Sequence, residues 1–307
     1  MCGIVFYEGL QTSKEFKKDY SCLVHRGPDM SRLISDEYGT FGFHRLAIMD
    51  VSDHGMQPFE TDHVRLMVNG EIYNELELID KYKDYPFVGH SDCETLIPLY
   101  LDKGSDMAKY LDAEFAFVLV DKKNGKILAG RDPIGIRPLF YGYQKENGKI
   151  AFASEMKSLL TLCDGITPFP PGYIYEDGVF KQYYDVTLTH DVLLDDQQAL
   201  VSIKEKLIKG VEKRMVMSDV PVGFLLSGGL DSSLVCSIAA QLTDIPLRTF
   251  SIGMSKDSID SKYAKIVADH IHSNHTDVMM TVDQVISCVR DVVYYLESYD
   301  ITTVRAS

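Results

Sequence analysis

The chain contains no tryptophan and only six cysteines among its 307 residues. The cysteines are scattered and form no Cys-x-x-Cys pair, which argues against a zinc ribbon and a disulfide framework and fits a reducing cytosol. No uncharged apolar run approaches the roughly 18 residues that a membrane span requires. The N-terminus lacks the basic region and apolar core of a secretory signal. We therefore expect a cytoplasmic protein with no membrane partner.

Basic residues are also in deficit. The chain has 31 Lys and Arg against 45 Asp and Glu, which gives a net charge of −14. An acidic surface repels a phosphate backbone, so we do not expect nucleic acid as a general partner. Hydrophobic residues make up 45% and charged residues 25%, as in ordinary soluble globular proteins, and the length suggests about two domains.

Residues 3–160 read as short β segments with few helices. Apolar or alternating runs bounded by turn residues predict the strands, and Asn-Gly pairs at 124–125 and 147–148 are strong hairpin signals. This pattern predicts packed sheets with helices outside, an α+β fold. The expected strands are 3–7, 39–48, 64–70, 115–121, 126–131, 139–143 and 149–153, and the expected helices are 14–24, 74–81 and 92–102.

A proline-rich stretch separates this half from a second one. We take 2–165 as the first domain, 166–193 as a connector with a small hairpin around Asp177-Gly178, and 194–307 as the second domain. After the connector, strands and helices alternate, which predicts a parallel sheet covered on both faces. Only about three strands fit, so the second domain looks incomplete at its C-terminus. The expected strands are 221–226, 247–252 and 275–280, and the expected helices are 195–215, 232–241, 262–271 and 282–297.

Cys2 occupies an unusual position. Methionine aminopeptidases remove Met1 when the second residue is small, and Cys2 would then carry a free α-amine beside its own thiol. Such an amine has an ordinary pKa of about 7.7–8.0, low enough to accept the thiol proton near neutral pH. A nucleophile and its base would then share one residue. Taken alone, however, a cysteine at position 2 is more often incidental.

Five ordered segments give Cys2 a context. Together they resemble the class II glutamine amidotransferase domain, an N-terminal-nucleophile hydrolase with a four-layer αββα fold. The resemblance covers about residues 2–160. The segments are Met-Cys-Gly-Ile-Val at 1–5, His-Arg-Gly-Pro-Asp at 25–29, His-Arg-Leu-Ala-Ile at 44–48, Val-Asn-Gly-Glu-Ile-Tyr-Asn at 68–74 and Gly-His-Ser-Asp-Cys-Glu at 89–94.

The resemblance implies a role for individual residues. It makes Cys2 the nucleophile, and it makes the Asn69 side-chain amide and the Gly70 backbone N–H the donors to the oxyanion. One such donor is typically worth roughly 2.7–4 kcal/mol of the barrier. Free glutamine also presents a carboxylate and an ammonium. Arg45 matches the family's carboxylate clamp, which suits a planar bidentate donor, and Asp92 matches the residue that receives the ammonium.

Further residues of the same segments have weaker assignments. Glu71 is expected to help orient the ammonium, and Ile48 and Asp50 lie on the family's glutamine-contacting loop. Arg26 and Asp29 form either a structural ion pair or a cleft-organising pair, and both readings stay open.

A second group of residues follows a short apolar strand. Ser-Gly-Gly-Leu-Asp-Ser-Ser at 227–233 leads from that strand into a helix. Glycines let backbone N–H groups approach oxyanions, and a helix N-terminus adds a favourable dipole. The Gly-Lys-Ser/Thr ending of a P-loop is absent, as is the dinucleotide fingerprint. The segment resembles the pyrophosphate loop of ATP pyrophosphatases, which implies ATP. A tight turn without a ligand is the alternative.

In that family, a residue before the loop and one in the next strand contact adenine and ribose. Asp231 is a candidate Mg²⁺ ligand, because magnesium prefers carboxylates together with phosphate oxygens. The candidate ATP-binding residues are Leu225, Leu226, Ser227, Gly228, Gly229, Asp231, Ser232, Ser233 and Ile252.

Residues 297–307 and the domain order resemble the glutamine-dependent asparagine synthetases. The resemblance implies that glutamine is hydrolysed at Cys2 and that the ammonia attacks aspartate activated by ATP as β-aspartyl-AMP. The products are asparagine, AMP, pyrophosphate and glutamate, so the chain would be an ATP-dependent carbon–nitrogen ligase. Thr302, Thr303 and Arg305 either hold aspartate or form a structural helix end.

In that family, the second domain continues with another phosphate loop and a phosphate-contacting lysine. Three interpretations therefore stay open for this chain. It is a fragment, or a subunit of a split enzyme whose other half is a separate chain, or a chain reduced to glutaminase activity or regulation. An amidotransferase acting on another acid is a further alternative, and a homodimer is one expected assembly.

Overall fold

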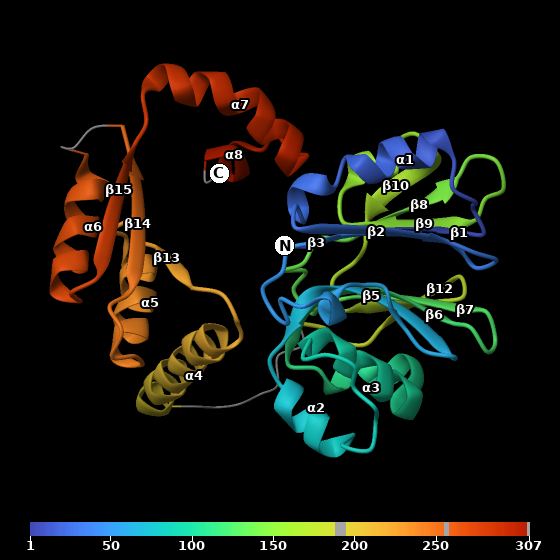
Figure 1. The fold of residues 1–307 in the computed structure, drawn as a ribbon. Coiled ribbons are helices and arrows are strands. Elements are labelled where there is room, and N and C mark those ends of the chain that lie inside the picture. The colour runs from blue at the N-terminus through green and yellow to red at the C-terminus, as the bar shows by residue number, and fades with distance from the viewer. Residues whose placement is uncertain (188–194, 255–257, 306–307) are drawn as a thin grey trace. The chain divides into compact units, whose positions relative to one another are not determined.

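The computed structural model describes residues 1–187, 195–254 and 258–305 (Figure 1). The chain divides into two compact units, Met1–Asp191 and Val192–Ser307. Within the described residues, the first unit holds two six-stranded sheets and the second a three-stranded sheet. In these residues we find no helix with the length and apolar character that crossing a bilayer requires.

The first sheet is built around the N-terminal strand. Strand β1 (Gly3–Glu8) pairs antiparallel with β3 (Gly39–Arg45) on one side and with β9 (Ile150–Ala153) on the other. The strand order is β10-β8-β9-β1-β3-β2. Because β1 is central, Cys2 precedes a strand that is held on both edges. The remaining strands are β2 (Met30–Ser35), β8 (Phe140–Gln144) and β10 (Cys163–Pro168).

The second sheet is a run of antiparallel strands in the order β12-β11-β7-β6-β5-β4. Its longest pair places Asn69 opposite Ala116 and Glu71 opposite Glu114. The strands are β4 (Phe59–Glu60), β5 (Val64–Ile72), β6 (Ala113–Asp121), β7 (Lys126–Arg131), β11 (Tyr173–Glu176) and β12 (Val179–Gln182).

The two sheets face each other, and helices cover their outer faces (Figure 1). Phe6, Phe43, Val118 and Phe152 belong to the apolar core between the sheets. Apolar residues of the outer helices pack on the opposite faces of the sheets and so leave water on folding. The α+β four-layer fold is therefore confirmed. The helices are α1 (Lys14–Ser21) on the first sheet, and α2 (Glu75–Lys81) and α3 (Leu96–Lys103) on the second, with the short 3₁₀ turn η3 (Asp92–Thr95) before α3.

The segment expected as a connector, 166–193, is largely part of the sheets. Strand β10 pairs with β8, while β11 and β12 form the hairpin expected around Asp177 and extend the second sheet beyond β7. Ile174 and Tyr175 are buried by this pairing, so the apolar pattern outweighs the nearby prolines. The connector interpretation is therefore wrong for residues 166–182, and residues 188–193 lie outside the described part. Sequence patterns also did not predict β2.

The second unit is a parallel sheet of the expected type. Strands β13 (Gly223–Leu225), β14 (Arg248–Gly253) and β15 (Asn274–Met279) pair in that order, with Leu225 opposite Phe250. Leu226, Cys236, Ala264 and Ala268 form a small buried cluster. The helices are α4 (Asp196–Val216), α5 (Leu230–Gln241), α6 (Ile259–His270), α7 (Val282–Leu296) and α8 (Ile301–Arg305).

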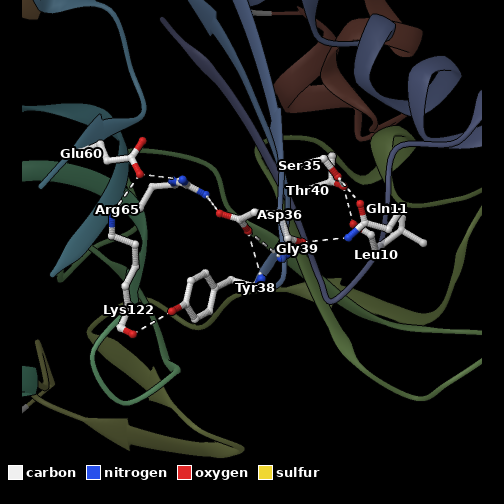
Figure 2. Close-up of polar contacts among 10 residues, drawn as sticks. All are labelled: Leu10, Gln11, Ser35, Asp36, Tyr38, Gly39, Thr40, Glu60, Arg65 and Lys122. Atoms are coloured by element: carbon white, nitrogen blue, oxygen red, sulfur yellow. Dashed lines mark hydrogen bonds and ion pairs between the residues drawn. The ribbon is translucent and has the colours of Figure 1, made fainter. Parts of the chain in front are cut away.

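A buried arginine joins the two sheets of the first unit (Figure 2). Arg65 on β5 donates to Asp36 in the β2–β3 turn and to Glu60 on β4, the latter at 2.7 Å. Its guanidinium lies 4.8 Å from the centre of the Phe41 ring on β3. Lys122 also binds Glu60, at 2.9 Å. The cation therefore links the sheets as well as neutralising two carboxylates.

We expect Arg65→Met to destabilise the first unit by about 2–4 kcal/mol, between the values for exposed and buried pairs. The substitution leaves the Asp36 and Glu60 carboxylates without their shared cation. Lys181→Met is the matched control, because Lys181 is exposed and surface ion pairs such as its bond to Glu176 contribute little to stability. Denaturant unfolding followed by circular dichroism measures both changes.

The loss of stability caused by Arg65→Met should depend on pH. Burial opposes ionisation of Glu60, but hydrogen bonds from Arg65 and Lys122 lower the pKa of its carboxyl below the ordinary 4.5. A lowered carboxyl pKa gives stability that is present above pH 4.5 and is lost as pH falls. The difference between wild type and Arg65→Met should therefore shrink in acid, and a difference that grows would contradict the assignment.

Candidate active site

A small pocket in the first unit collects most of the glutamine-site residues predicted from the sequence. Cys2 precedes β1, Arg45 ends β3, and Asp92 begins η3. The pocket therefore draws on both sheets and on the helical layer. Seven of the eight predicted residues line it, namely Cys2, Arg45, Ile48, Asn69, Gly70, Glu71 and Asp92.

The eighth, Asp50, is not among the lining residues. Its carboxylate accepts hydrogen bonds from the Ser52 N–H at 3.2 Å and from the His90 N–H at 2.8 Å. Asp50 thus joins two loops beside the pocket, and the structure gives it a bracing position.

The backbone and thiol of Cys2 are held from two sides. The Leu46 N–H points at Sγ, with a nitrogen–sulfur distance of 3.4 Å. On the other side, Arg26 Nε donates to the Cys2 carbonyl at 3.0 Å, and Arg26 Nη1 donates to Glu155 at 3.0 Å. Glu155 therefore orients the arginine that orients the nucleophile candidate.

The proposed pairing of Arg26 with Asp29 is not what the structure shows. Arg26 pairs with Glu155, while Asp29 accepts the Ala47 N–H at 2.8 Å. The two carboxylates differ because Glu155 follows β9, which lies directly beside β1, whereas Asp29 faces the loop after β3. The cleft-organising reading of Arg26 fits its contact with Cys2.

Proton affinities in the pocket suit a nucleophile paired with an amine. With Met1 in place, burial raises the pKa of the Cys2 thiol above its ordinary value. Burial also lowers the pKa of the amino terminus below its ordinary value. A buried neutral thiol needs a nearby base in order to attack, and burial of an amine favours its unprotonated, basic form.

Asn69 supplies an unused hydrogen-bond donor. Its side chain is buried, and within the described residues its Nδ2 has no hydrogen-bond partner. A buried donor left unpaired typically costs about 1–3 kcal/mol, so such groups call for a ligand. Gly70 is the next residue on β5, which places its backbone beside the same pocket. The pair matches the donors of an oxyanion site.

Arg45 is buried and folds the following loop around itself. Its guanidinium donates to the carbonyls of Ser52, at 2.6 Å, Met49, at 3.2 Å, and Asp50. Gly55 lies so close that an added Cβ would overlap the guanidinium. Arg45 therefore positions the pocket rim, and a substrate carboxylate would have to share or replace these carbonyl bonds.

The carboxylates of Glu71 and Asp92 form an acidic end of the pocket. The pKa of Glu71 is raised to about 8, chiefly by burial and then by the neighbouring Asp92 charge, while Arg137 opposes the rise. Burial likewise raises the pKa of Asp92, whose carboxylate accepts the Ile72 N–H at 2.7 Å. An ammonium bound here would relieve the repulsion between the two carboxylates.

Arg137 is a pocket residue that sequence reasoning missed. It ends the segment Arg-Asp-Pro-Ile-Gly-Ile-Arg at 131–137, which follows β7. The signal was a loop with three charged residues around a Pro and a Gly, because functional residues often lie on loops. Leu46 was missed because it acts through its backbone, which no sequence pattern reports.

The predicted phosphate loop lies at the carboxyl end of β13. Ser227 and Ser232 hydroxyls are 3.0 Å apart, and the Gly229 N–H points at Ser227 Oγ at 3.4 Å. Gly228 has φ +81, and an added Cβ would lie 2.6 Å from the Ala264 nitrogen of α6. Ser233 Oγ is buried and has no partner within the described residues. A glycine in a close approach and an orphaned hydroxyl fit a phosphate-binding loop.

The other candidate ATP-binding residues differ in the solvent exposure of their side chains. Leu225 is 83% exposed and Ile252 60% exposed, whereas Leu226 is fully buried, so Leu225 is the accessible member of the pair. Asp231 lies exposed in the first turn of α5. Among the described residues, no cluster of three metal-binding side chains occurs, so Asp231 alone supports the Mg²⁺ hypothesis.

The C-terminal candidates for binding aspartate lie on α8. There the Thr303 N–H donates to the Asp300 carboxylate at 2.9 Å, which caps this short helix. This contact favours the structural reading for Thr303. Nothing is described for the Arg305 side chain.

The family comparison defines a class, the glutamine amidotransferase domains, and the two facing sheets of the first unit agree with it. A family model described as a glutamine amidotransferase domain matches residues 1–170, and the chain belongs to that family. A second model, described as asparagine synthase, matches residues 202–307.

The chain is similar over most of its length to proteins named as asparagine synthetases. The chain is 39% identical over 337 residues to a probable glutamine-hydrolysing asparagine synthetase of Dictyostelium discoideum, covering 100% of this chain and 60% of the relative. It is 39% identical over 303 residues to glutamine-hydrolysing asparagine synthetase B of Escherichia coli strain K12, covering 92% and 54%. The chain thus spans somewhat more than half the length of these relatives.

A solved structure supports the fold. Glutamine phosphoribosylpyrophosphate amidotransferase from B. subtilis matches with a TM-score of 0.50, covering 99% of this chain and 94% of that chain. At 13% identity, this likeness concerns the fold alone.

The close approach of Gly55 to Arg45 generates a prediction. Gly55→Ala should displace the guanidinium and loosen the loop that forms the pocket rim, because the new methyl group overlaps it. If the pocket binds glutamine, we expect KM for glutamine to rise at least about tenfold, with a smaller change in kcat. Steady-state glutaminase assays measure both. Gly210→Ala in α4 is the control, since its Cβ position is 3.9 Å from the nearest atom and alanine favours a helix, and an equal rise in KM there would contradict the explanation.

Proposed function

We propose that the first unit hydrolyses glutamine at Cys2. The observation that carries this proposal is the gathering of Cys2, the unpartnered Asn69 amide and the acidic pair Glu71 and Asp92 in one pocket. The pocket then offers a nucleophile, an oxyanion donor and a receptor for an ammonium group. Arg45 would receive the substrate carboxylate.

The proposed reaction begins with removal of Met1. The freed amine of Cys2 accepts the thiol proton, and the sulfur attacks the side-chain amide carbon of glutamine. The oxyanion that forms is stabilised by the Asn69 amide and the Gly70 N–H. Return of the proton to the amide nitrogen releases ammonia and leaves a thioester on Cys2. Water then cleaves the thioester, giving glutamate and the free thiol.

We further propose that the second unit contributes to ATP-dependent transfer of this ammonia to aspartate. The orphaned Ser233 hydroxyl and the close-packed Gly228 support phosphate binding at 227–233, and the relatives are named as asparagine synthetases. ATP would be the substrate, and Asp231 would assist Mg²⁺ on its phosphates. The aspartate side-chain carboxylate would attack the α-phosphate and release pyrophosphate, and ammonia would displace AMP to give asparagine.

Activation of the acid explains why such a reaction needs ATP. A free carboxylate repels a nucleophile, and hydroxide is a poor leaving group, whereas AMP leaves readily. The relatives extend beyond the region that this chain matches, and we propose that further residues take part in the synthetase site. A separate chain would supply them if the enzyme is split, and assembly as a homodimer in the cytoplasm completes the proposal.

Two alternatives use the same pocket. A chain that acts only as a glutaminase would release ammonia and bind no ATP. An amidotransferase for another acid would form AMP with an acceptor other than aspartate. Assays of AMP formation across a panel of carboxylic acids, with any missing half supplied, distinguish these cases.

Cys2→Ala should reduce glutamine hydrolysis at least about 10⁴-fold, because the only proposed nucleophile is removed. Glutamate release from purified chains measures the effect. Cys22→Ala is the matched control, since Cys22 is partly exposed and is not among the pocket-lining residues. Equal activity in the wild type and the Cys2→Ala chain would refute the nucleophile assignment. Mass spectrometry of the active chain should also show loss of Met1, and a retained Met1 would remove the proposed base.

Gly228→Ala should weaken ATP binding by about tenfold or more, because φ +81 is strained for alanine and the methyl group would press on α6. Equilibrium dialysis with ATP and Mg²⁺ measures binding. Gly210→Ala in α4 is the control, since its Cβ position is 3.9 Å from the nearest atom and alanine favours a helix. A Gly228→Ala chain that binds ATP as the control does would exclude this loop as the phosphate site.

A further inference from the structure

Arg137 lies in the glutamine pocket between two carboxylates on neighbouring strands. Its Nη2 is 3.0 Å from Glu114 Oε1 and 3.7 Å from Glu71 Oε1. The guanidinium is almost fully buried, and within the described residues its Nε has no hydrogen-bond partner. The guanidinium therefore lines the pocket, and its Nε–H group remains available as a hydrogen-bond donor.

The loop that carries Arg137 is held rigidly. Buried Asp132 accepts the N–H groups of Ile134, Ile136 and Arg137, the last at 2.9 Å. Arg131 donates to the Arg137 carbonyl at 2.8 Å from the other side. These hydrogen bonds hold the backbone of Arg137 in place. A side chain on a fixed backbone is partly preorganised for its role.

Without this cation, the two glutamates would repel each other. Glu71 on β5 and Glu114 on β6 are directly opposite in an antiparallel pair, so their side chains leave the same face of the sheet. Like charges at such positions are destabilising. Arg137 is the cation that contacts both carboxylates in the described structure, and it comes from a third element.

Several other groups influence Glu71. Burial and the negative charges around Glu71 favour its neutral form, whereas Arg137 and the amino terminus favour its ionised form. Only the ionised form can receive an ammonium as an ion pair. The titratable or charged groups that interact with Glu71 are Asp92 on η3, Glu114 on β6, Arg137 after β7, the amino terminus and Cys2 before β1, and Cys93 on η3.

We propose that Arg137 is a positioning residue of the glutamine site, which offsets the charge of Glu114 and so favours the carboxylate form of Glu71 that receives the substrate's ammonium. This inference rests on the proposed glutaminase function. It separates the roles of the two pocket arginines, because Arg45 shapes the rim near the substrate carboxylate while Arg137 sets the charge at the opposite, acidic end. Arg137 would act through Glu71 and need not touch glutamine.

The test is glutamine binding to chains that also carry Cys2→Ala, measured by calorimetry from about pH 6 to pH 9. Arg137→Gln should move the pH midpoint of binding upward by about one unit, because loss of the cation raises the pKa of Glu71. Near pH 7, binding should then weaken about tenfold and recover as pH rises. Arg137→Lys keeps the charge, so its midpoint should stay within about 0.3 unit of the parent.

The double variant Arg137→Gln/Glu114→Gln gives the sharpest readout. Removal of the Glu114 charge should restore both the midpoint and the affinity to within about threefold of the parent. A structural role of Arg137 predicts instead that the double variant is no better than the single one. Thermal unfolding of each chain separates loss of binding from loss of fold, and Arg32→Gln is the control for an exposed arginine.

Four outcomes would overturn the inference. The first is a Glu114 change that restores nothing, and the second is a pH-independent loss of affinity in Arg137→Gln. The third is a shift of a full unit in the pH midpoint of binding in Arg137→Lys. This variant keeps the inference testable if Arg137→Gln does not fold. In the fourth, the Cys2→Ala chain with Arg137 intact binds no glutamine and the wild type hydrolyses none, which would overturn the proposed function as well.

Discussion

The central position of strand β1 fixes the place of Cys2, and the candidate active site depends on that placement. Residues 3–8 form the centre of a sheet, with neighbours on both edges. The residue before a strand held in this way has little positional freedom, and the Arg26 and Leu46 contacts reduce it further. A reactive group at a chain end, usually the most mobile place in a fold, is thereby set at a fixed point of a pocket.

Charge balance is the second constraint on that pocket. Its acidic end holds Glu71 and Asp92, and its two arginines lie on different elements and serve different neighbours. Burial makes each charge expensive unless it is paired. The unpaired Asn69 amide and the unpaired Arg137 Nε are thus notable, because they are buried donors that the described fold leaves available. A polar substrate with complementary groups would satisfy them.

The candidate site of the second unit is built from fewer segments. In its loop after β13, Gly228 lies against the backbone of α6, and the helix that follows begins without a side-chain cap. Both units therefore place their candidate chemistry where a strand meets a loop. In the first unit side chains converge from five segments, whereas in the second a continuous stretch of seven residues supplies most of the site.

That difference also separates what the sequence determined from what tertiary structure decided. The hairpins around Asn124 and Asn147, the parallel sheet and the loop at 227–233 follow from local patterns, because turn chemistry and strand periodicity depend on near neighbours. The edge strand at 30–35 was not predicted. The hairpin around Asp177 was expected, but only within a connector, because its attachment to β7 joins segments far apart in the chain. Likewise, Cys2 and Asn69 were identifiable by motif, but the pairing of Arg26 with Glu155, the bracing place of Asp50 and the role of Arg137 depend on contacts between segments far apart in the chain. Such contacts leave no local signal, and only the folded arrangement specifies them.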